Sequence, residues 1–305
     1  MPFPSPALSV PSLTTYELSY GGLKFGGIVA GSAYQLQRLG GLDTPPIITA
    51  DQQRALDQGE FAGLDLSGGR DIPIDLVVRT DGTSLDHARR ALGAVMTPQG
   101  ATEAPLWLQL PSGTFACMAR PKKYSGPPVD VSSLVGGGGV ANILMHATDP
   151  RWYSAPSKTQ TVGLPAPLGG LGFPVTFPAS FGGGGVGGIL QVYNNGLFEM
   201  RPVLIFTGPC TNPSATNLSI AGAPTIGFTI SLAAGDTLVV GTDFQSAVYT
   251  VAGSTAGSSR RNLLTPTSTW FNLPPGLNQI EFNTTDGTQV AGTLTVQSAD
   301  AWLSL

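Results

Sequence analysis

The chain has 305 residues, which fits one large domain or two domains of ordinary size. Hydrophobic residues make up 41% and allow a substantial core, whereas charged residues make up only 11%, well below the usual proportion of about a quarter. The net charge of −4, without any run of lysine or arginine, argues against nucleic-acid binding, which requires a basic stripe. With 41 glycines and 26 prolines, the composition favours an all-β protein of short strands and turns rather than a disordered chain.

The sequence shows no pattern of a membrane, secretion or metal-binding protein. No segment reaches the roughly 18 consecutive apolar residues that span a bilayer, so we expect no membrane insertion. The N-terminal M-P-F-P-S-P lacks the basic and apolar regions of a secretion signal. Cys117 and Cys210 are far apart, and neither has a cysteine or histidine at ligand spacing. We therefore predict two buried thiols rather than a disulfide or a metal site, and no cofactor.

The first part of the chain predicts several strands. Residues 16–25 alternate in polarity around a Gly-Gly pair, which is typical of a hairpin, and residues 34–38 continue as another strand. Residues 51–66 contain glycine-bearing turns and are expected to form a loop. Residues 70–78 alternate apolar and polar side chains and form the clearest predicted strand, although Pro73 on its outward face favours an edge position or a bulge.

One helix is predicted, over Leu85–Met96. Thr83 or Ser84 can cap its first turn, where Asp86 suits the helix dipole, and Pro98 ends it. An apolar stripe runs along one face of this helix: Leu85, Ala88, Leu92 and Val95.

A second hairpin is expected around Pro111-Ser112-Gly113, between strands at residues 105–111 and 114–119. The four glycines Gly136–Gly139 are not followed by the Gly-Lys-Ser/Thr sequence and helix of a phosphate-binding loop, so we expect a flexible hairpin tip. In the strand that follows, His146 is predicted to be a packed residue rather than a ligand.

A shift to proline, glycine and serine between residues 154 and 188 predicts a domain boundary. We expect an N-terminal domain over residues 1–155, a linker over residues 156–188 that packs across the junction, and a C-terminal domain over residues 189–305. Short, evenly spaced strands with polar turns predict that the C-terminal domain is an antiparallel β-sandwich. The predicted strands are 188–194, 200–207, 217–220, 225–230, 237–241, 247–251, 279–283 and 292–297.

The chain offers little catalytic chemistry, and we expect no enzymatic activity. A serine-histidine-acid triad would have to use His87 or His146, and each of these lies in a segment whose residues are better explained by a structural role. Paired carboxylates for glycoside hydrolysis exist in loops, but the sequence singles out no pair. The candidates are Glu60, Asp65, Glu103, Glu199 and Asp243.

The segment over residues 259–282 contains no nucleophile, base or metal ligand, and we interpret it as structural. Trp270 and Phe271 are expected in a sandwich core, and Pro275, Gly276 and Asn278 are expected to form the turn before the next strand. The alternative is that an aromatic side chain such as Trp270 or Trp302 is exposed and stacks on a pyranose ring. The surrounding apolar sequence favours the core.

Two ordered sets of motifs run through the chain. The first comprises Tyr20-Gly-Gly-Leu-x-Phe25, Gly59-x-Phe61-x-Gly63, the strand from Arg70, the helix ending at Met96-x-Pro98, Leu106-x-Leu108 and Asp149-Pro150-x-Trp-Tyr153. The second comprises Gly208-Pro209-x-x-Asn212-Pro213, Leu232-x-Ala-Gly-Asp236, Ser259-Arg-Arg261, Trp270-Phe271-x-Leu273 and Pro275-Gly-x-Asn278-x-Ile-x-Phe282. Their order and spacing resemble those of the distal tail (Dit) proteins of siphophages.

This resemblance implies a mainly β fold, with an N-terminal β-sandwich or split-barrel-like domain carrying one helix and a C-terminal galectin-like antiparallel β-sandwich. It implies a structural virion protein at the distal end of a phage tail, assembled in the host cytoplasm as a homo-oligomeric ring, expected to be a hexamer. The implied partners are the tail-tube protein, the tail-tip hub and other minor tail proteins, and the ring surrounds the DNA channel without specific nucleic-acid binding.

The alternative function is a carbohydrate-binding host-recognition module whose partner is a host-surface glycan. Galectin likeness does not by itself imply sugar binding, because function depends on sites rather than on folds. Under either function the resemblance marks seven residues as structural signatures of the fold rather than chemical groups: Trp270, Phe271, Pro275, Gly276, Asn278, Asp149 and Pro150.

Overall fold

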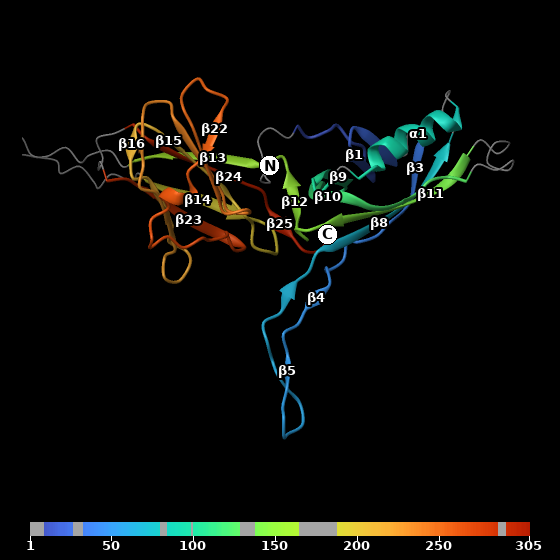
Figure 1. Ribbon diagram of the computed structural model, residues 1–305, viewed down its shortest axis with the longest axis horizontal. Helices are drawn as coiled ribbons and strands as arrows, with labels where there is room; N and C mark the ends of the chain where they lie inside the picture. Colours follow the sequence, from blue (N-terminus) through green and yellow to red (C-terminus); the bar gives the residue numbers. More distant parts are fainter. Residues whose placement is uncertain are drawn as a thin grey trace, which may run out of the picture. The chain divides into compact units, whose positions relative to one another are not determined.

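The computed structural model describes residues 9–26, 33–79, 84–98, 100–128, 138–164, 188–285 and 291–305. The chain forms two compact units. The N-terminal unit comprises Ser9–Pro156 and Ala301–Leu305, and the C-terminal unit comprises Ser157–Asp300. Both are built mainly from antiparallel strands, and the described residues contain one α-helix, so the predicted fold class is confirmed (Figure 1).

The predicted domain boundaries need two corrections. Strand β13 (Lys158–Gly163), placed in the predicted linker, pairs along its whole length with β24 (Thr293–Ser298) of the C-terminal unit. Strand β25 (Ala301–Trp302), placed in the predicted C-terminal domain, pairs with β12 (Trp152–Ala155) of the N-terminal unit. β13 is a largely polar edge strand, so its sequence carries no apolar alternation to reveal it. The rest of the predicted linker, residues 165–187, lies outside the described residues.

The N-terminal unit is organised around one curved sheet with the strand order β2-β1-β9-β10-β11-β8-β3, and β12 and β25 extend it from β10. Phe25 in β2 and Tyr34 in β3 make an edge-to-face contact at 5.7 Å, so the two ends of the sheet approach each other around the core. The remaining strands are β1 (Glu17–Tyr20), β2 (Leu23–Gly26), β3 (Tyr34–Leu39), β8 (Arg70–Arg79), β9 (Ala104–Leu110), β10 (Gly113–Ser125) and β11 (Gly138–Ala147).

Helix α1 (Leu85–Met96) covers one face of this sheet and has the predicted bounds (Figure 1). Its first turn is capped by Ser84, whose hydroxyl accepts a hydrogen bond from the His87 N–H at 3.3 Å. The helix buries Ala88, Leu92 and Met96 against the sheet. The helix is therefore held by its cap and by the apolar stripe that the sequence predicts.

The hairpin around the Gly-Gly pair is confirmed, with Tyr20 of β1 opposite Leu23 of β2. The second hairpin is also confirmed, with Leu110 opposite Gly113. The expectation that Pro73 marks an edge strand or a bulge is wrong, because β8 lies between β11 and β3 and pairs without a bulge across Pro73. The Pro73 carbonyl accepts a hydrogen bond from the N–H of Gly40 at 2.9 Å, and Gly40 directly follows the end of β3. Proline has no N–H to donate, but at this position the neighbouring strand has already ended.

Arg70 at the start of β8 is almost fully buried, with 1% of its surface exposed. Its guanidinium donates to the backbone carbonyls of Pro150 at 2.9 Å and Gly41 at 2.5 Å, and also to those of Asp43 and Leu303. One side chain thus joins the start of β8, the loop after β3, the chain before β12 and the C-terminal segment.

The C-terminal unit is an antiparallel sandwich, as predicted. One sheet has the order β13-β24-β15-β20-β21-β22 and the other has the order β14-β23-β17-β18. Phe206 of the first sheet contacts Phe282 of the second at 6.0 Å, within a buried core. The remaining elements are β14 (Ile189–Asn194), β15 (Val203–Thr207), β16 (Cys210–Thr211), β17 (Ser214–Asn217), β18 (Thr225–Gly227), β19 (Ser231–Leu232), β20 (Thr237–Gly241), β21 (Ser246–Thr250), β22 (Gly257–Ser259), η1 (Arg261–Leu263) and β23 (Gly276–Asn283).

The predicted turn before β20 is closed by Asp236. Its carboxylate accepts hydrogen bonds from the Tyr249 hydroxyl at 2.7 Å, the Ala252 N–H at 2.9 Å and the Ala233 N–H at 3.0 Å. These bonds, the tyrosine's first, hold the pKa of Asp236 below its ordinary value. Gly235 supplies the positive φ of 83° that the turn requires.

Cys117 and Cys210 are both buried and form no disulfide, as predicted. Burial raises the pKa of the Cys117 thiol well above its ordinary value, which keeps it protonated.

Candidate assembly surfaces and a polar pocket

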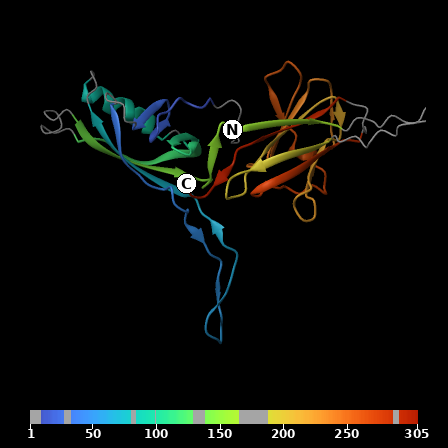
Figure 2. The same ribbon diagram turned by 180° about the vertical axis from the view of Figure 1, so that it is seen from behind.

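A two-stranded arm leaves the sheet of the N-terminal unit between β3 and β8. Its base is the pair β4 (Ile47–Ile48) and β7 (Leu66–Ser67), and farther out β5 (Gln52–Gln53) pairs with β6 (Glu60–Phe61). The arm runs away from the curved sheet in both views (Figures 1 and 2). The prediction of a loop over residues 51–66 is therefore wrong. The paired stretches are only two residues long, too short for an alternating pattern to be recognised in the sequence.

The arm exposes a set of large apolar side chains. Six of them are between 56% and 101% exposed: Ile47, Ile48, Leu56, Phe61, Leu64 and Leu66. Single exposed apolar residues are ordinary on a protein surface, but six within twenty residues of a narrow arm are not. Such a concentration is typical of surfaces that are covered by another protein.

The arm has a defined shape of its own. Gly63 crosses so close to the opposite strand that a Cβ would lie 2.2 Å from the Ala50 carbonyl oxygen. The Gly63 N–H donates to the Asp51 carboxylate at 2.8 Å, and the guanidinium of Arg54 lies 4.9 Å from the centre of the Phe61 ring. The arm is therefore a specific hairpin, although a two-stranded ribbon without further cover is only marginally stable in water.

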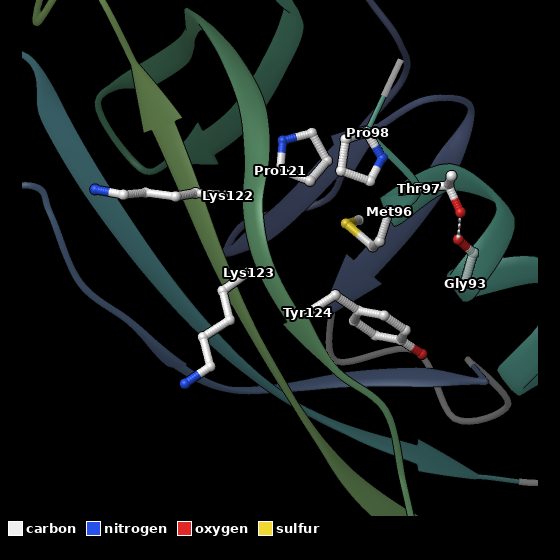
Figure 3. Close-up of a pocket in the computed structure, with 8 residues that line it drawn as sticks. All are labelled: Gly93, Met96, Thr97, Pro98, Pro121, Lys122, Lys123 and Tyr124. Carbon is white, nitrogen blue, oxygen red and sulfur yellow. Dashed lines mark hydrogen bonds between the residues drawn. The ribbon is translucent and has the colours of Figure 1, made fainter. Parts of the chain in front are cut away.

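A groove of about 470 Å³ lies between the C-terminal end of α1 and the irregular part of β10. Figure 3 shows the Met96, Pro98 and Pro121 side chains grouped over this groove, with the Tyr124 ring beside the helix end. Lys122 and Lys123 point away from that group (Figure 3). The Tyr124 hydroxyl is buried and has no hydrogen-bond partner among the described residues. The groove is apolar and carries no catalytic arrangement.

A second, polar pocket of about 220 Å³ lies in the C-terminal unit. Its lining residues come from three segments: Arg201, Thr242, Asp243, Gln245, Trp270, Phe271 and Asn272. Phe271 is buried, with 5% of its surface exposed, as predicted. Trp270 is partly exposed, so the expectation that it belongs to the core is wrong. Burial alternates along this segment, because Phe271 and Leu273 are buried whereas Trp270 and Asn272 are only partly buried, as expected when adjacent side chains face opposite ways.

The candidate catalytic residues do not come together. His146 contacts the Asp71 carboxylate at 2.6 Å, and Lys122 contacts the same carboxylate at 3.0 Å. Although burial opposes it, hydrogen bonds from these two residues hold the pKa of Asp71 below its ordinary value. Within the described part of the chain, no serine hydroxyl is hydrogen-bonded to the imidazole ring of His146 or His87; Ser84 meets only the backbone N–H of His87. Asp71, His146 and Lys122 therefore form a group of surface ion pairs on neighbouring strands rather than a catalytic triad.

The candidate carboxylates make local contacts. Glu103 accepts from Thr148, Glu199 accepts from Asn272 at 2.9 Å, and Asp243 accepts from Arg201 at 2.6 Å. Over the described residues there is no group of three or more histidine, cysteine or acidic side chains placed to hold a metal ion. None of the described helices is long and apolar enough to cross a membrane.

Comparison with known proteins matches more than nine-tenths of the chain to solved phage structures. The crystal structure of the Dit protein of phage SPP1 shares 15% identity and a TM-score of 0.61, over 94% of this chain and 99% of that one. A chain in the structure of the phage P2 baseplate, in its activated conformation with calcium, shares 11% identity and a TM-score of 0.52, over 92% of this chain and 97% of that one. The strontium form of the same baseplate gives a TM-score of 0.53. This chain has the Dit fold.

At these identities the likeness concerns the Dit fold alone. No family model matches the chain, and no curated protein matches it. The structural neighbours support the family resemblance that the ordered motifs predict.

Two signature residues of the Dit resemblance lie in the N-terminal unit, where they organise the chain before β12. The Asp149 carboxylate accepts from the Arg151 guanidinium at 2.9 Å and from the Tyr153 hydroxyl at 2.8 Å. The Pro150 carbonyl accepts from the buried Arg70. Both residues therefore have structural contacts. The sequence shows the motif, but not the partner that lies 80 residues earlier.

Three further signature residues of the Dit resemblance, Pro275, Gly276 and Asn278, lie around the start of β23. Pro275 is exposed, and Gly276 has a φ of 96°, which an L-residue rarely adopts. Asn278 is fully buried, and its side-chain amide donates to the carbonyls of Pro274 at 2.9 Å and Gly276 at 3.2 Å. The Asn278 side chain thus closes the predicted turn by donating hydrogen bonds to two of the turn's carbonyls.

Proposed function

We propose that this chain is a structural, non-enzymatic component of a phage tail tip, an adaptor at the distal end of the tail. In this role it assembles as a homo-oligomeric ring, a hexamer, that joins the tail tube to the tail-tip hub and surrounds the DNA channel. The proposal rests on the Dit fold over nearly the whole chain. The single observation in this chain that supports assembly is the arm with its six exposed apolar side chains.

The arm favours a ring over a two-fold dimer. An arm that docks on a different surface of the next subunit makes a head-to-tail contact, and such contacts form rings when the rotation closes. In this proposal, the arm's apolar surface is covered by a second copy of this chain.

The magnitude shows what the arm can contribute. Full burial of one Leu, Ile or Phe side chain contributes about 1.5–3 kcal/mol, so covering the six partly to fully exposed side chains contributes on the order of 6–12 kcal/mol. Association costs about 4–15 kcal/mol in lost translational and rotational freedom. The two ranges overlap, so burial of the arm is of the same size as the cost of association, and further contacts from the tail tube, the hub or the sheet would add to the stability of the ring.

The test is the mass of the full chain in solution, alone and after mixing with tail-tube and hub proteins. A hexamer has a mass of about 188 kDa, six times the chain mass of 31.4 kDa, and light scattering or mass photometry separates it from the monomer. The double variant Leu56→Asp/Phe61→Asp should prevent ring formation, because it places carboxylates on the surface that is buried. Val251→Asp, at a residue of the C-terminal unit that is 51% exposed, is the matched control and should assemble normally.

A wild-type chain that stays monomeric even when mixed with both partner proteins would contradict the proposed ring. An arm variant that assembles like the wild type would remove the arm from the interface. Assays on peptidoglycan and polysaccharide should show no hydrolysis by the wild-type chain, and turnover of either substrate would contradict the non-enzymatic role.

A second candidate function is recognition of a host-surface glycan by the C-terminal unit. One observation favours it: Trp270 is partly exposed in a polar pocket instead of being buried in the core. The two functions are compatible, because the arm and this pocket belong to different compact units.

A further inference from the structure

The sheet of the N-terminal unit has two faces of different character. In β8, alternate residues from Ile72 to Val78 are buried in the core that helix α1 covers, so the residues between them point to the opposite side. Backbone pairing continues this opposite side across β11, β3 and the last part of β10. Figure 3 shows Lys122 and Lys123 of β10 pointing away from the helix. We call this side the outer sheet face.

The outer sheet face is basic, although the whole chain has a net charge of −4. Alternation and pairing place five basic side chains on it: Arg38, Arg79, Arg120, Lys122 and Lys123. Among the described residues its acidic side chains are Asp71 and Asp75, which gives the face a net charge of +3 with His146 neutral. Asp71 is already held by Lys122 and His146, and Asp75 accepts from the Asn142 amide at 2.8 Å.

Most of these basic side chains have no carboxylate partner. Within the described residues, no ion pair involves Arg38, Arg79, Arg120 or Lys123. Like charges on one face of a sheet repel each other when they lie within the screening length, which is about 10 Å at 0.1 M salt. A partner surface that carries carboxylates would turn this repulsion into attraction.

The outer sheet face also carries apolar side chains between its cations. Val140 is 46% exposed, and Pro73, Val77 and Leu144 are half-buried. A nucleic-acid backbone is bound by basic and polar groups and does not use an exposed valine. The combination of unpaired cations and apolar side chains therefore fits a protein surface that is both acidic and apolar.

The arm of the N-terminal unit has this complementary character. From β4 to β7 it carries a net charge of −3, from one basic and four acidic side chains: Arg54, Asp51, Asp57, Glu60 and Asp65. Glu60 and Asp65 are exposed and make no hydrogen bond or ion pair with other described residues. Glu60 precedes Phe61, and Asp65 lies between Leu64 and Leu66, so carboxylates and exposed apolar side chains alternate along the arm.

We propose that the arm of one copy docks on the outer sheet face of the next copy. Glu60 and Asp65 then approach the unpaired cations of that face, and the apolar side chains of the arm cover Val140 and its neighbours. The arm runs away from its own sheet in both views, so the contact requires a second copy (Figures 1 and 2). Each copy gives one arm and receives another, which is a head-to-tail contact. The inference rests on the proposed ring and names the surface that receives the arm.

The experiment exchanges the charges of the two surfaces in the full chain and measures assembly by mass photometry, with the tail-tube and hub proteins present. The arm variant Glu60→Lys/Asp65→Lys changes the charge of the arm from −3 to +1, and the face variant Arg38→Glu/Lys123→Glu changes that of the face from +3 to −1. All four residues are exposed, so both variants should fold. Each variant alone should assemble at least about tenfold more weakly than the wild type, because its arm and face then carry the same sign of charge. An equimolar mixture of the two should recover assembly, since alternating copies again bring opposite charges together.

Arg260→Glu/Arg261→Glu is the control, because it makes the same change of charge in the C-terminal unit and should assemble like the wild type. Wild-type assembly by either charge variant overturns the docking, and so does a mixture that fails to recover while circular dichroism shows both variants folded. If the face variant assembles normally but loses binding to a short duplex DNA that the wild type binds, the face serves nucleic acid and the docking is wrong. Rings formed by both charge variants refute the docking and leave the adaptor role intact, whereas a wild type that never assembles refutes the ring itself.

Discussion

The buried Arg70 offers a sharp test of how the N-terminal unit is held together. We choose Arg70→Met, because methionine keeps much of the apolar stem and removes the guanidinium that donates to four backbone carbonyls. The expected result is a large loss of stability and release of the C-terminal segment, since Leu303 is one of the four acceptors.

The size of the effect follows from the surroundings of each carbonyl. Pro150 is buried, so its carbonyl cannot recover a partner from water, whereas Asp43 is exposed and can. Hydrogen bonds to charged groups contribute about 1.5–3 kcal/mol each, and two such bonds lost without replacement give a destabilisation of about 3–6 kcal/mol. With a urea slope of about 2 kcal/mol per molar, the unfolding midpoint should fall by about 2 M.

The assay is urea unfolding followed by tryptophan fluorescence in a Trp270→Phe background. Of the four tryptophans, Trp107, Trp152 and Trp302 belong to the N-terminal unit, so this background reports on that unit alone. Trp302 contacts Phe115 edge-to-face at 5.3 Å, and its release should also make the C-terminal residues sensitive to carboxypeptidase under native conditions.

Arg79→Ala at the other end of β8 is the control, because Arg79 is exposed and its replacement should change stability by less than about 0.5 kcal/mol. If Arg70→Met shifts stability no more than this control and leaves the C-terminus protected, the four-carbonyl arrangement does not hold the unit together. Partial retention in Arg70→Lys would indicate that charge matters more than the geometry of the guanidinium.

Three further predictions address the arm, the C-terminal unit and the thiols. Gly63→Val should open the arm, because a Cβ there would lie 2.2 Å from the Ala50 carbonyl oxygen. Proteolysis within the arm should accelerate, while urea unfolding of the N-terminal unit stays unchanged. If the variant resists proteolysis like the wild type, the two strands of the arm do not cross closely at Gly63. The lowered pKa of Asp236 means that folding favours its carboxylate, so this contribution is complete above about pH 4 and is lost as the pH falls through the folded pKa. Asp236→Asn should therefore remove part of the acid sensitivity of Trp270 fluorescence, and an unchanged acid transition would contradict that role. Cys117 and Cys210 should resist a thiol reagent in the native chain and react fully in denaturant, whereas rapid native labelling would disprove their burial.

Patterns that repeat along the backbone were predictable from the sequence. Residues 70–78 formed a strand because alternation fixes which side chains face a core, and Leu85–Met96 formed a helix because its cap, stripe and terminating proline agree. The ordered motifs between Tyr20 and Phe282 indicated the Dit fold, which the solved phage structures support even at 15% identity or less. The alternation of apolar and polar residues did not reveal strands that are short or polar, such as those of the arm and β13.

Trp270 shows why the candidate site was harder to predict than the fold. Its apolar neighbours suggested a core residue, but burial of Phe271 in an extended segment turns the adjacent side chain to the opposite face. Whether that face meets protein or solvent depends on Arg201 and Asp243, which approach only through the pairing of distant strands. No local signal in the sequence specifies that approach.

The sequence by itself determined the β class, the single helix, the buried thiols and the ordered motifs, because each follows from composition or from contacts between near neighbours. Only the tertiary structure decided that Arg70 collects four carbonyls, that residues 301–305 return to the N-terminal unit, and that an apolar arm stands out from the sheet. These features depend on groups up to 233 residues apart. The free energy of such contacts is set by burial and geometry, which no stretch of sequence carries alone.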